Sequence, residues 1–186
     1  MGYHTFDADG ADKLERPERR YRFLSTEELL WALALSSEDI VADLGSGTGF
    51  FTDDVAPHVS GVYAVDIQEA MHEYYEEKGV PENVELVTTG VEELPFEDGS
   101  LDAAFSTMTF HEFVSDDALA EIRRVFTPAG RLVIVDWTAT GTGENGPPLD
   151  ERYTADAAAD ALRDHGFSIE HQFSRPETFL LVATIE

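Results

Sequence analysis

The chain has no cysteine and only two lysines, Lys13 and Lys78, among its 186 residues. The absence of cysteine excludes a disulfide scaffold, a thiolate zinc site and a cysteine nucleophile. No apolar run approaches the roughly 18 residues of a membrane span, and residues 1–10 lack the apolar core of a signal peptide. We therefore expect a cytoplasmic protein with no membrane partner.

Positive charge as a whole is scarce, with 12 Lys and Arg residues against 38 Asp and Glu residues and a net charge of −26. Such a surface repels nucleic acid and anionic membranes, which excludes nucleic acid as a partner. The acids are spread between apolar segments, so a disordered acidic tail does not explain them. The composition resembles that of proteins from extreme halophiles, in which molar salt screens the self-repulsion. A basic protein partner is the alternative explanation.

The length and an apolar content of 42% fit one core of ordinary size. We expect an N-terminal leader or lid over residues 1–23 and a single domain over residues 24–186. Short apolar runs predict strands at 40–44, 61–66, 84–87, 101–106, 131–137, 167–173 and 178–185. Helices are expected after Ser25 and at 50–58, 68–78, 116–126 and 154–165, with Pro128 and Gly130 as the stop after residue 126. This alternation is typical of an α/β fold with a parallel sheet, and the short turn before residue 178 predicts an antiparallel hairpin.

A glycine loop, Asp43-Leu44-Gly45-Ser46-Gly47-Thr48-Gly49, joins the first expected strand to the helix that follows it. Glycine at alternate positions permits unusual backbone angles and lets a ligand lie against bare main chain. The loop lacks the third glycine of the dinucleotide fingerprint, which would fall on Phe50, and it lacks the lysine of a phosphate loop. A tight turn whose glycines serve packing alone is the alternative.

Asp66 ends the second expected strand, about 20 residues beyond the loop. An acid at this place can accept hydrogen bonds from both hydroxyls of a ribose. Alternatively, Asp66 caps the helix that follows.

These segments resemble the class I S-adenosylmethionine-dependent methyltransferases, in particular the type 11 group that is similar to ubiquinone/menaquinone C-methyltransferases. The resemblance covers the chain from about residue 24 to its end, and residues 92–102 and 123–132 also match runs typical of the family. It implies a Rossmann-like fold with a seven-stranded, mostly parallel sheet, an antiparallel last strand and helices on both faces. It also implies S-adenosylmethionine as the cofactor, S-adenosylhomocysteine as the product, and no metal.

The resemblance assigns cofactor binding to twelve residues: Asp43, Gly45, Ser46, Gly47, Thr48, Gly49, Asp66, Ile67, Gly90, Val91, Glu92 and Thr107. Gly90 stands where the family has an aspartate that reaches the adenine amino group. That contact is therefore expected from the backbone, from Glu92, or not at all. Ala129 replaces the first glycine of the family's Pro-Gly-Gly turn, and we expect this change to be neutral.

The candidate catalytic residue is His111, just beyond the fourth expected strand, where the ligand crevice of an open α/β sheet lies. A neutral imidazole there can accept a substrate proton, with Glu112 orienting or charging it. The alternative is a histidine that packs under the cofactor. Further on, Trp137 either faces the substrate or packs, and Arg152 pairs either with an anionic substrate or with Asp150.

His4, Tyr21 and the arginines of the leader either fold over the cofactor or form a solvated charged helix, and the second is favoured. The resemblance implies methyl transfer to a small-molecule acceptor in a crevice that is open or closed by the second subunit of a homodimer. The alternatives are a cofactor-binding protein without transfer activity, a protein methyltransferase, and a nicotinamide oxidoreductase.

Overall fold

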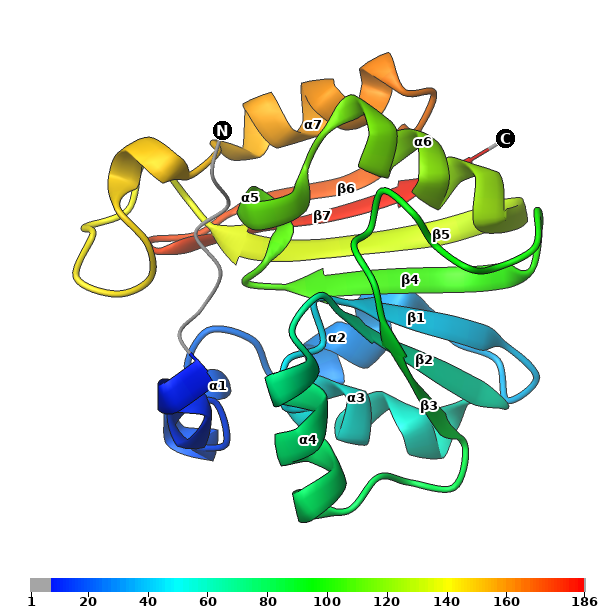
Figure 1. Ribbon diagram of the computed structural model, residues 1–186. Helices are drawn as coiled ribbons and strands as arrows, with labels where there is room; N and C mark the ends of the chain where they lie inside the picture. Colours follow the sequence, from blue (N-terminus) through cyan, green and yellow to red (C-terminus); the bar gives the residue numbers. More distant parts are fainter. Residues whose placement is uncertain (1–7, 186) are drawn as a thin grey trace.

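The computed structural model describes residues 8–185, and its strands form one seven-stranded sheet in the order β3-β2-β1-β4-β5-β7-β6 (Figure 1). Strands β1 to β5 run parallel to one another, and β7 runs antiparallel to both β5 and β6. The strands are β1 Ile40–Leu44, β2 Gly61–Asp66, β3 Val84–Thr88, β4 Leu101–Thr107, β5 Phe126–Trp137, β6 Ser168–Ser174 and β7 Thr178–Thr184. The expected α/β fold and its terminal hairpin are confirmed.

Seven helices connect or precede these strands within the described residues. Ser25, Ser115 and Thr154 begin three of them, each accepting a hydrogen bond from the backbone N–H three residues later. The helices are α1 Pro17–Arg20, α2 Thr26–Leu33, α3 Phe50–Val55, α4 Glu69–Lys78, α5 Phe110–Phe113, α6 Asp116–Val125 and α7 Ala155–Asp164, with short 3₁₀ turns η1 Ala8–Lys13, η2 Ala56–His58 and η3 Leu149–Glu151. No described helix is long and apolar enough to cross a bilayer.

Each face of the sheet buries its own apolar cluster, because successive strand residues point to opposite sides. Val41 and Phe105 belong to the cluster that includes α2 and α3. Ala42 and Ala104, their neighbours in sequence, belong to the cluster that includes α5, α6 and α7. Figure 1 shows these last three helices together on one side of the sheet. Helices therefore cover both faces, as expected.

Strand β5 differs from the prediction, because it begins at Phe126 rather than at residue 131 and follows α6 without a separating loop. Its pairing with β4 shifts register after Phe126 and resumes at Arg131. Within this irregular stretch Ala129 has a φ of 67°. Pro128 and Gly130 therefore mark a bulge inside a strand, and Ala129 occupies a left-handed conformation that favours glycine. This conformation argues against a neutral change, because glycine adopts it without the strain that alanine incurs.

The described part of the leader contains the short charged helix α1, whose residues 17–19 are exposed, and it also packs against the domain. Ala11 is buried, and the guanidinium of Arg20 lies 4.9 Å from the ring centroid of Phe51. The hydroxyl of Tyr21 donates to the carboxylate of Asp54 at 3.0 Å. His4 lies outside the described residues. In Figure 1 the leader lies beside the edge of the sheet toward which β4 and β5 point.

Candidate cofactor and acceptor site

A crevice opens at the carboxyl ends of β1, β2 and β4, where the order of the strands reverses. This is the place at which open α/β sheets bind their ligands. The predicted cofactor residues that line it are Gly45, Ser46, Gly47, Thr48, Asp66, Ile67, Gly90, Val91, Glu92 and Thr107. Asp43 and Gly49, the first and last residues of the glycine loop, are not among the residues that line the crevice.

The three glycines of the loop all have positive φ, but they serve different purposes. A Cβ atom at Gly45 would lie 2.5 Å from the side chain of Thr109, and one at Gly49 would lie 2.0 Å from the ring of Tyr75. At Gly47 the nearest heavy atom would be 3.6 Å away, on Leu14. Packing therefore explains Gly45 and Gly49, whereas Gly47 leaves bare backbone open to the crevice.

Asp66 fixes the glycine loop and faces the same crevice. Its Oδ2 accepts the N–H of Gly47 at 2.8 Å, and its Oδ1 accepts the N–H of Gln68 at 2.9 Å. Helix α4 has Gln68 as its N-cap, so the interpretation of Asp66 as the cap is wrong. Each carboxylate oxygen keeps a lone pair for a further donor, which is what recognition of a ribose needs.

Asp43 supports the loop from inside the fold. It is fully buried, and its Oδ2 accepts a hydrogen bond from the hydroxyl of Thr52 at 2.7 Å, which ties β1 to α3. Burial raises the pKa of Asp43 to about 7, although the bond from Thr52 and the charge of Arg20 act in the opposite direction. Its Oδ1 has no hydrogen-bond partner in the part of the chain that the structure describes.

The carboxylate of Glu92 occupies the space beside Gly90. A Cβ atom at Gly90 would lie 2.6 Å from both carboxylate oxygens of Glu92. An acidic group therefore stands next to the position of the missing aspartate, and Glu92 is the stronger of the candidates for the adenine contact. Ile67, 57% exposed on the crevice wall, offers an apolar face to a flat ring.

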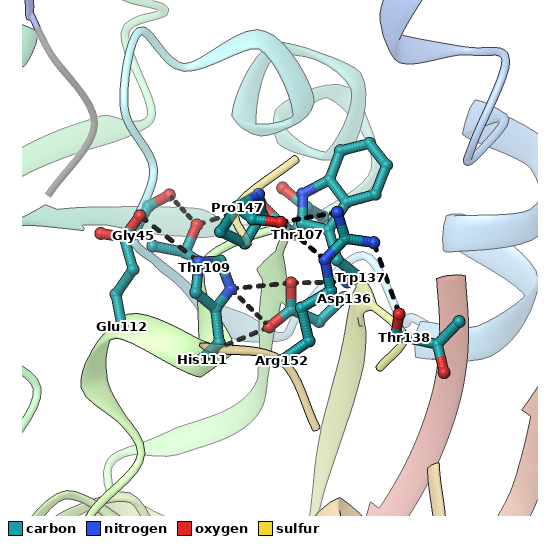
Figure 2. Close-up of polar contacts among 10 residues, drawn as sticks. All are labelled: Gly45, Thr107, Thr109, His111, Glu112, Asp136, Trp137, Thr138, Pro147 and Arg152. Carbon is teal, nitrogen blue, oxygen red and sulfur yellow. Dashed lines mark hydrogen bonds and ion pairs between the residues drawn. The ribbon is translucent and has the colours of Figure 1, made fainter. Parts of the chain in front are cut away.

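His111 lies between two carboxylates at the carboxyl ends of β4 and β5 (Figure 2). Its Nδ1 is 2.9 Å from Oδ2 of Asp136, so this nitrogen donates a proton, and its Nε2 is 3.8 Å from Oε1 of Glu112. Burial lowers the pKa of His111, but the hydrogen bond and charge of Asp136 outweigh it, and the pKa is raised. Glu112 lines the crevice whereas His111 does not.

Glu112 itself is a carboxylate in a partly buried place. Burial raises its pKa to about 7, and the negative charges of Asp66, Asp136 and Glu151 act in the same direction against the lowering effect of His111. A carboxylate that titrates near neutrality on a crevice wall is suited to accept or donate a proton.

The alternatives considered for Arg152 both fail. Arg152 is buried, its Nε donates to the carbonyl of Pro147 at 2.8 Å, and its Nη2 donates to the carbonyl of Asn145. The guanidinium lies 5.6 Å from the ring centroid of Trp137, which also packs edge-on against Phe23 at 4.8 Å. Arg152 thus holds the loop after β5 in shape (Figure 2), and Trp137 packs rather than lining the crevice.

Several lining residues escaped the sequence analysis, notably Leu14 from the leader, and Met71 and Phe113 from α4 and α5; Arg20, one of the leader arginines considered as part of a lid, also lines the crevice. No local pattern marks them, because they reach the crevice only through the tertiary fold. Among the described residues, no group of three or more His, Asp or Glu side chains is arranged to hold a metal ion.

The fold agrees with comparisons to known proteins. The family model for a methyltransferase domain matches residues 42–134. An S-adenosylmethionine-dependent methyltransferase of Aquifex aeolicus has a crystal structure that is 30% identical, covers 98% of this chain and 100% of its own, and superposes with a TM-score of 0.88.

Two sequence relatives agree with this. A methyltransferase-like protein of Schizosaccharomyces pombe is 34% identical over 133 residues, which is 70% of this chain and 50% of that protein. The ubiquinone/menaquinone biosynthesis C-methyltransferase of Brucella canis is 34% identical over 121 residues, which is 60% of this chain and 43% of that protein. The chain thus spans about half the length of these relatives. It belongs to the class I S-adenosylmethionine-dependent methyltransferases.

Proposed function

We propose that the protein transfers a methyl group from S-adenosylmethionine to a small-molecule acceptor. One observation carries this proposal: the open backbone of Gly47 and the carboxylate of Asp66 are hydrogen-bonded at 2.8 Å and line the same crevice. Gly47 thus offers bare main chain to the amino-acid end of the cofactor, and the adjacent Asp66 offers a carboxylate to its ribose.

The residues of the crevice fit the two ends of this cofactor. Gly45 to Thr48 would hold the methionine end, Asp66 the ribose, and Ile67, Val91 and Glu92 the adenine. When bound, the cofactor supplies a methyl group on a positively charged sulfur, so that transfer requires alignment more than activation. The carboxylates of Asp66 and Glu92 suit a positively charged ligand. The proposal includes no metal.

His111 remains the proposed proton-handling residue, with a refinement of its role. Glu112 is the group on the crevice wall, so His111 would act on the acceptor through Glu112, held in place by Asp136. Homodimer formation, in which a second subunit would close the crevice, remains a proposal. A cytoplasmic, high-salt setting is a proposal from the composition of the chain.

Calorimetric titration of S-adenosylmethionine and S-adenosylhomocysteine in molar potassium chloride tests the proposal. Wild type should show saturable binding, which Asp66→Ala and Gly47→Val should abolish. Asp164→Ala, which removes an exposed acid on α7, should bind as wild type does. Absence of binding to folded wild type would overturn the proposed function.

Binding without transfer activity is the second candidate, and Gly90 favours it because the usual adenine-binding aspartate is missing. Mass spectrometry of the methylated product separates the two candidates. Cofactor binding with no methylated product across a broad acceptor panel would favour the second.

A further inference from the structure

Arg20 brings a positive charge into a crevice whose other charged walls are acidic. It is the last residue of α1, and among the described residues that line the crevice it is the one Lys or Arg. Asp66, Glu92 and Glu112 line the same crevice. Arg20 comes from the leader, more than twenty residues before the glycine loop that it faces.

The guanidinium of Arg20 is placed without a matching anion. It lies over the rings of Phe51 and Phe50, at 4.9 and 5.7 Å from their centroids. Its Nε is buried and has no hydrogen-bond partner among residues 8–185, and no carboxylate in that range forms an ion pair with it. Burying a charge without such partners is costly, so an unpaired guanidinium on a crevice wall indicates a missing anion.

Two neighbouring acids act on Arg20 from a distance. Burial lowers the pKa of Arg20 to about 10, and the charges of Asp43 and Glu15 oppose that effect. The guanidinium therefore stays protonated at neutral pH. Glu15 is already engaged, since it accepts a hydrogen bond from Thr48 and pairs with Lys78 at 3.2 Å.

A second unpartnered donor lies in the same crevice. The hydroxyl of Ser46, in the glycine loop, is buried and has no hydrogen-bond partner within the described structure. A guanidinium and a hydroxyl beside the open backbone of Gly47 form a set of donors suited to a carboxylate. The amino-acid end of the cofactor carries such a carboxylate.

We propose that Arg20, together with Ser46, binds the carboxylate of the amino-acid end of the cofactor. This inference rests on the proposed function and adds the leader to the cofactor site. The contacts of Glu15 with Thr48 and Lys78 hold the leader against the loop, so the site is complete only when the leader is docked. A competing interpretation is that Arg20 only packs on Phe50 and Phe51.

Calorimetry with two ligands separates these interpretations. S-adenosylhomocysteine carries the amino-acid end, whereas 5′-methylthioadenosine has the same adenosine thioether without it. Arg20→Gln should weaken the first ligand roughly 10- to 100-fold and leave the second within about twofold. Arg20→Lys should lie between wild type and Arg20→Gln, because it keeps the charge but loses the planar fork.

Arg16→Gln is the matched control, since it removes another leader cation, one that is exposed and paired with Asp12 at 3.1 Å. It should change neither affinity. Equal weakening of both ligands in Arg20→Gln and Arg20→Lys would show that Arg20 only holds the fold of the leader, and unchanged binding would exclude any role; either result overturns the inference. Failure of wild type to bind S-adenosylhomocysteine would instead remove the proposed function, and this inference with it.

Discussion

The carboxylate of Asp136 holds His111 at two points. It accepts a hydrogen bond from Nδ1 of the ring at 2.9 Å and another from the backbone N–H of the same residue at 2.7 Å. The first bond places the proton of the neutral ring on Nδ1 and leaves Nε2 facing Glu112. The pair thus fixes both the position of the imidazole and its tautomer.

Asp136→Asn tests this relationship. The amide keeps the shape of the side chain but removes the charge that raises the pKa of His111. The pKa of His111 should fall, because burial then acts with less opposition. Nitrogen-15 NMR of the imidazole ring across neutral pH measures this shift. Asp160→Asn, exposed on α7, should leave it unchanged, and an unaltered His111 titration in Asp136→Asn would contradict the prediction.

Glu112→Gln should stabilise the protein at neutral and alkaline pH. The pKa of Glu112 is about 7 in the folded protein against an ordinary 4.5, so the folded state holds this proton more tightly than the unfolded chain. Stability from this group is therefore present below pH 4.5 and lost as pH rises toward 7. Glutamine cannot ionise. At about pH 8 the melting temperature of Glu112→Gln should therefore exceed that of wild type by about 2–4 °C, which corresponds to about 1 kcal/mol in the free energy of unfolding.

The same comparison at about pH 5 should show most of that gain gone, because wild-type Glu112 is then mainly protonated. Glu97→Gln, at an exposed position, should have no effect at either pH. Thermal denaturation followed by circular dichroism gives both values. A lower melting temperature of Glu112→Gln at pH 8 would show that the ionised carboxylate stabilises the fold.

Two exposed alanines in left-handed conformations predict stabilising replacements. Ala34, at the end of α2, has a φ of 52°, and Ala129, in the bulge of β5, has a φ of 67°. Glycine removes the clash of Cβ with the following carbonyl, and part of that gain is offset by the greater freedom of the unfolded chain. Each change to glycine should add about 0.5–1 kcal/mol to the free energy of unfolding.

Ala157→Gly is the matched control for both replacements. Ala157 is exposed within α7, where glycine should cost about 1 kcal/mol. Urea denaturation of the three variants and wild type measures the free energy of unfolding, which should rise for the first two replacements and fall for Ala157→Gly. Destabilisation by all three replacements would mean that the left-handed conformations carry no strain.

The same physical terms explain which parts of the structure the sequence predicts. Strands β1 and β2 have the predicted bounds, because each is a short apolar run that ends at a strong signal, the glycine loop or Asp66. The start of β5 is not predicted, because Pro128 and Gly130 normally interrupt structure. Here pairing with β4 continues past them and takes precedence over local preference.

The candidate site divides in the same way. The cofactor loop is a contiguous motif whose chemistry follows from its own residues. Arg20 lines the crevice only because the leader packs beside the glycine loop. Whether His111 or Glu112 faces the crevice depends on the orientation of α5, a helix of only four residues. A rotation of this helix by one residue position would exchange the two.

The net charge of −26 predicts that salt stabilises the fold. Six Lys or Arg side chains form ion pairs with carboxylates within the described residues, against 38 acids in the chain, so most carboxylates repel one another without a matching cation. At about 1 M salt the Debye length falls to about 3 Å, which screens this repulsion. The melting temperature should therefore rise between dilute buffer and molar potassium chloride.

Screening depends on ionic strength rather than on the identity of the cation, so sodium chloride and potassium chloride should act alike at equal concentration. Sucrose at matched osmolality controls for effects of excluded volume and hydration. A melting temperature that does not change with salt would contradict adaptation to high salt. The acidic surface would then be better explained by a basic protein partner, because opposite charges on such a partner would offset the same repulsion.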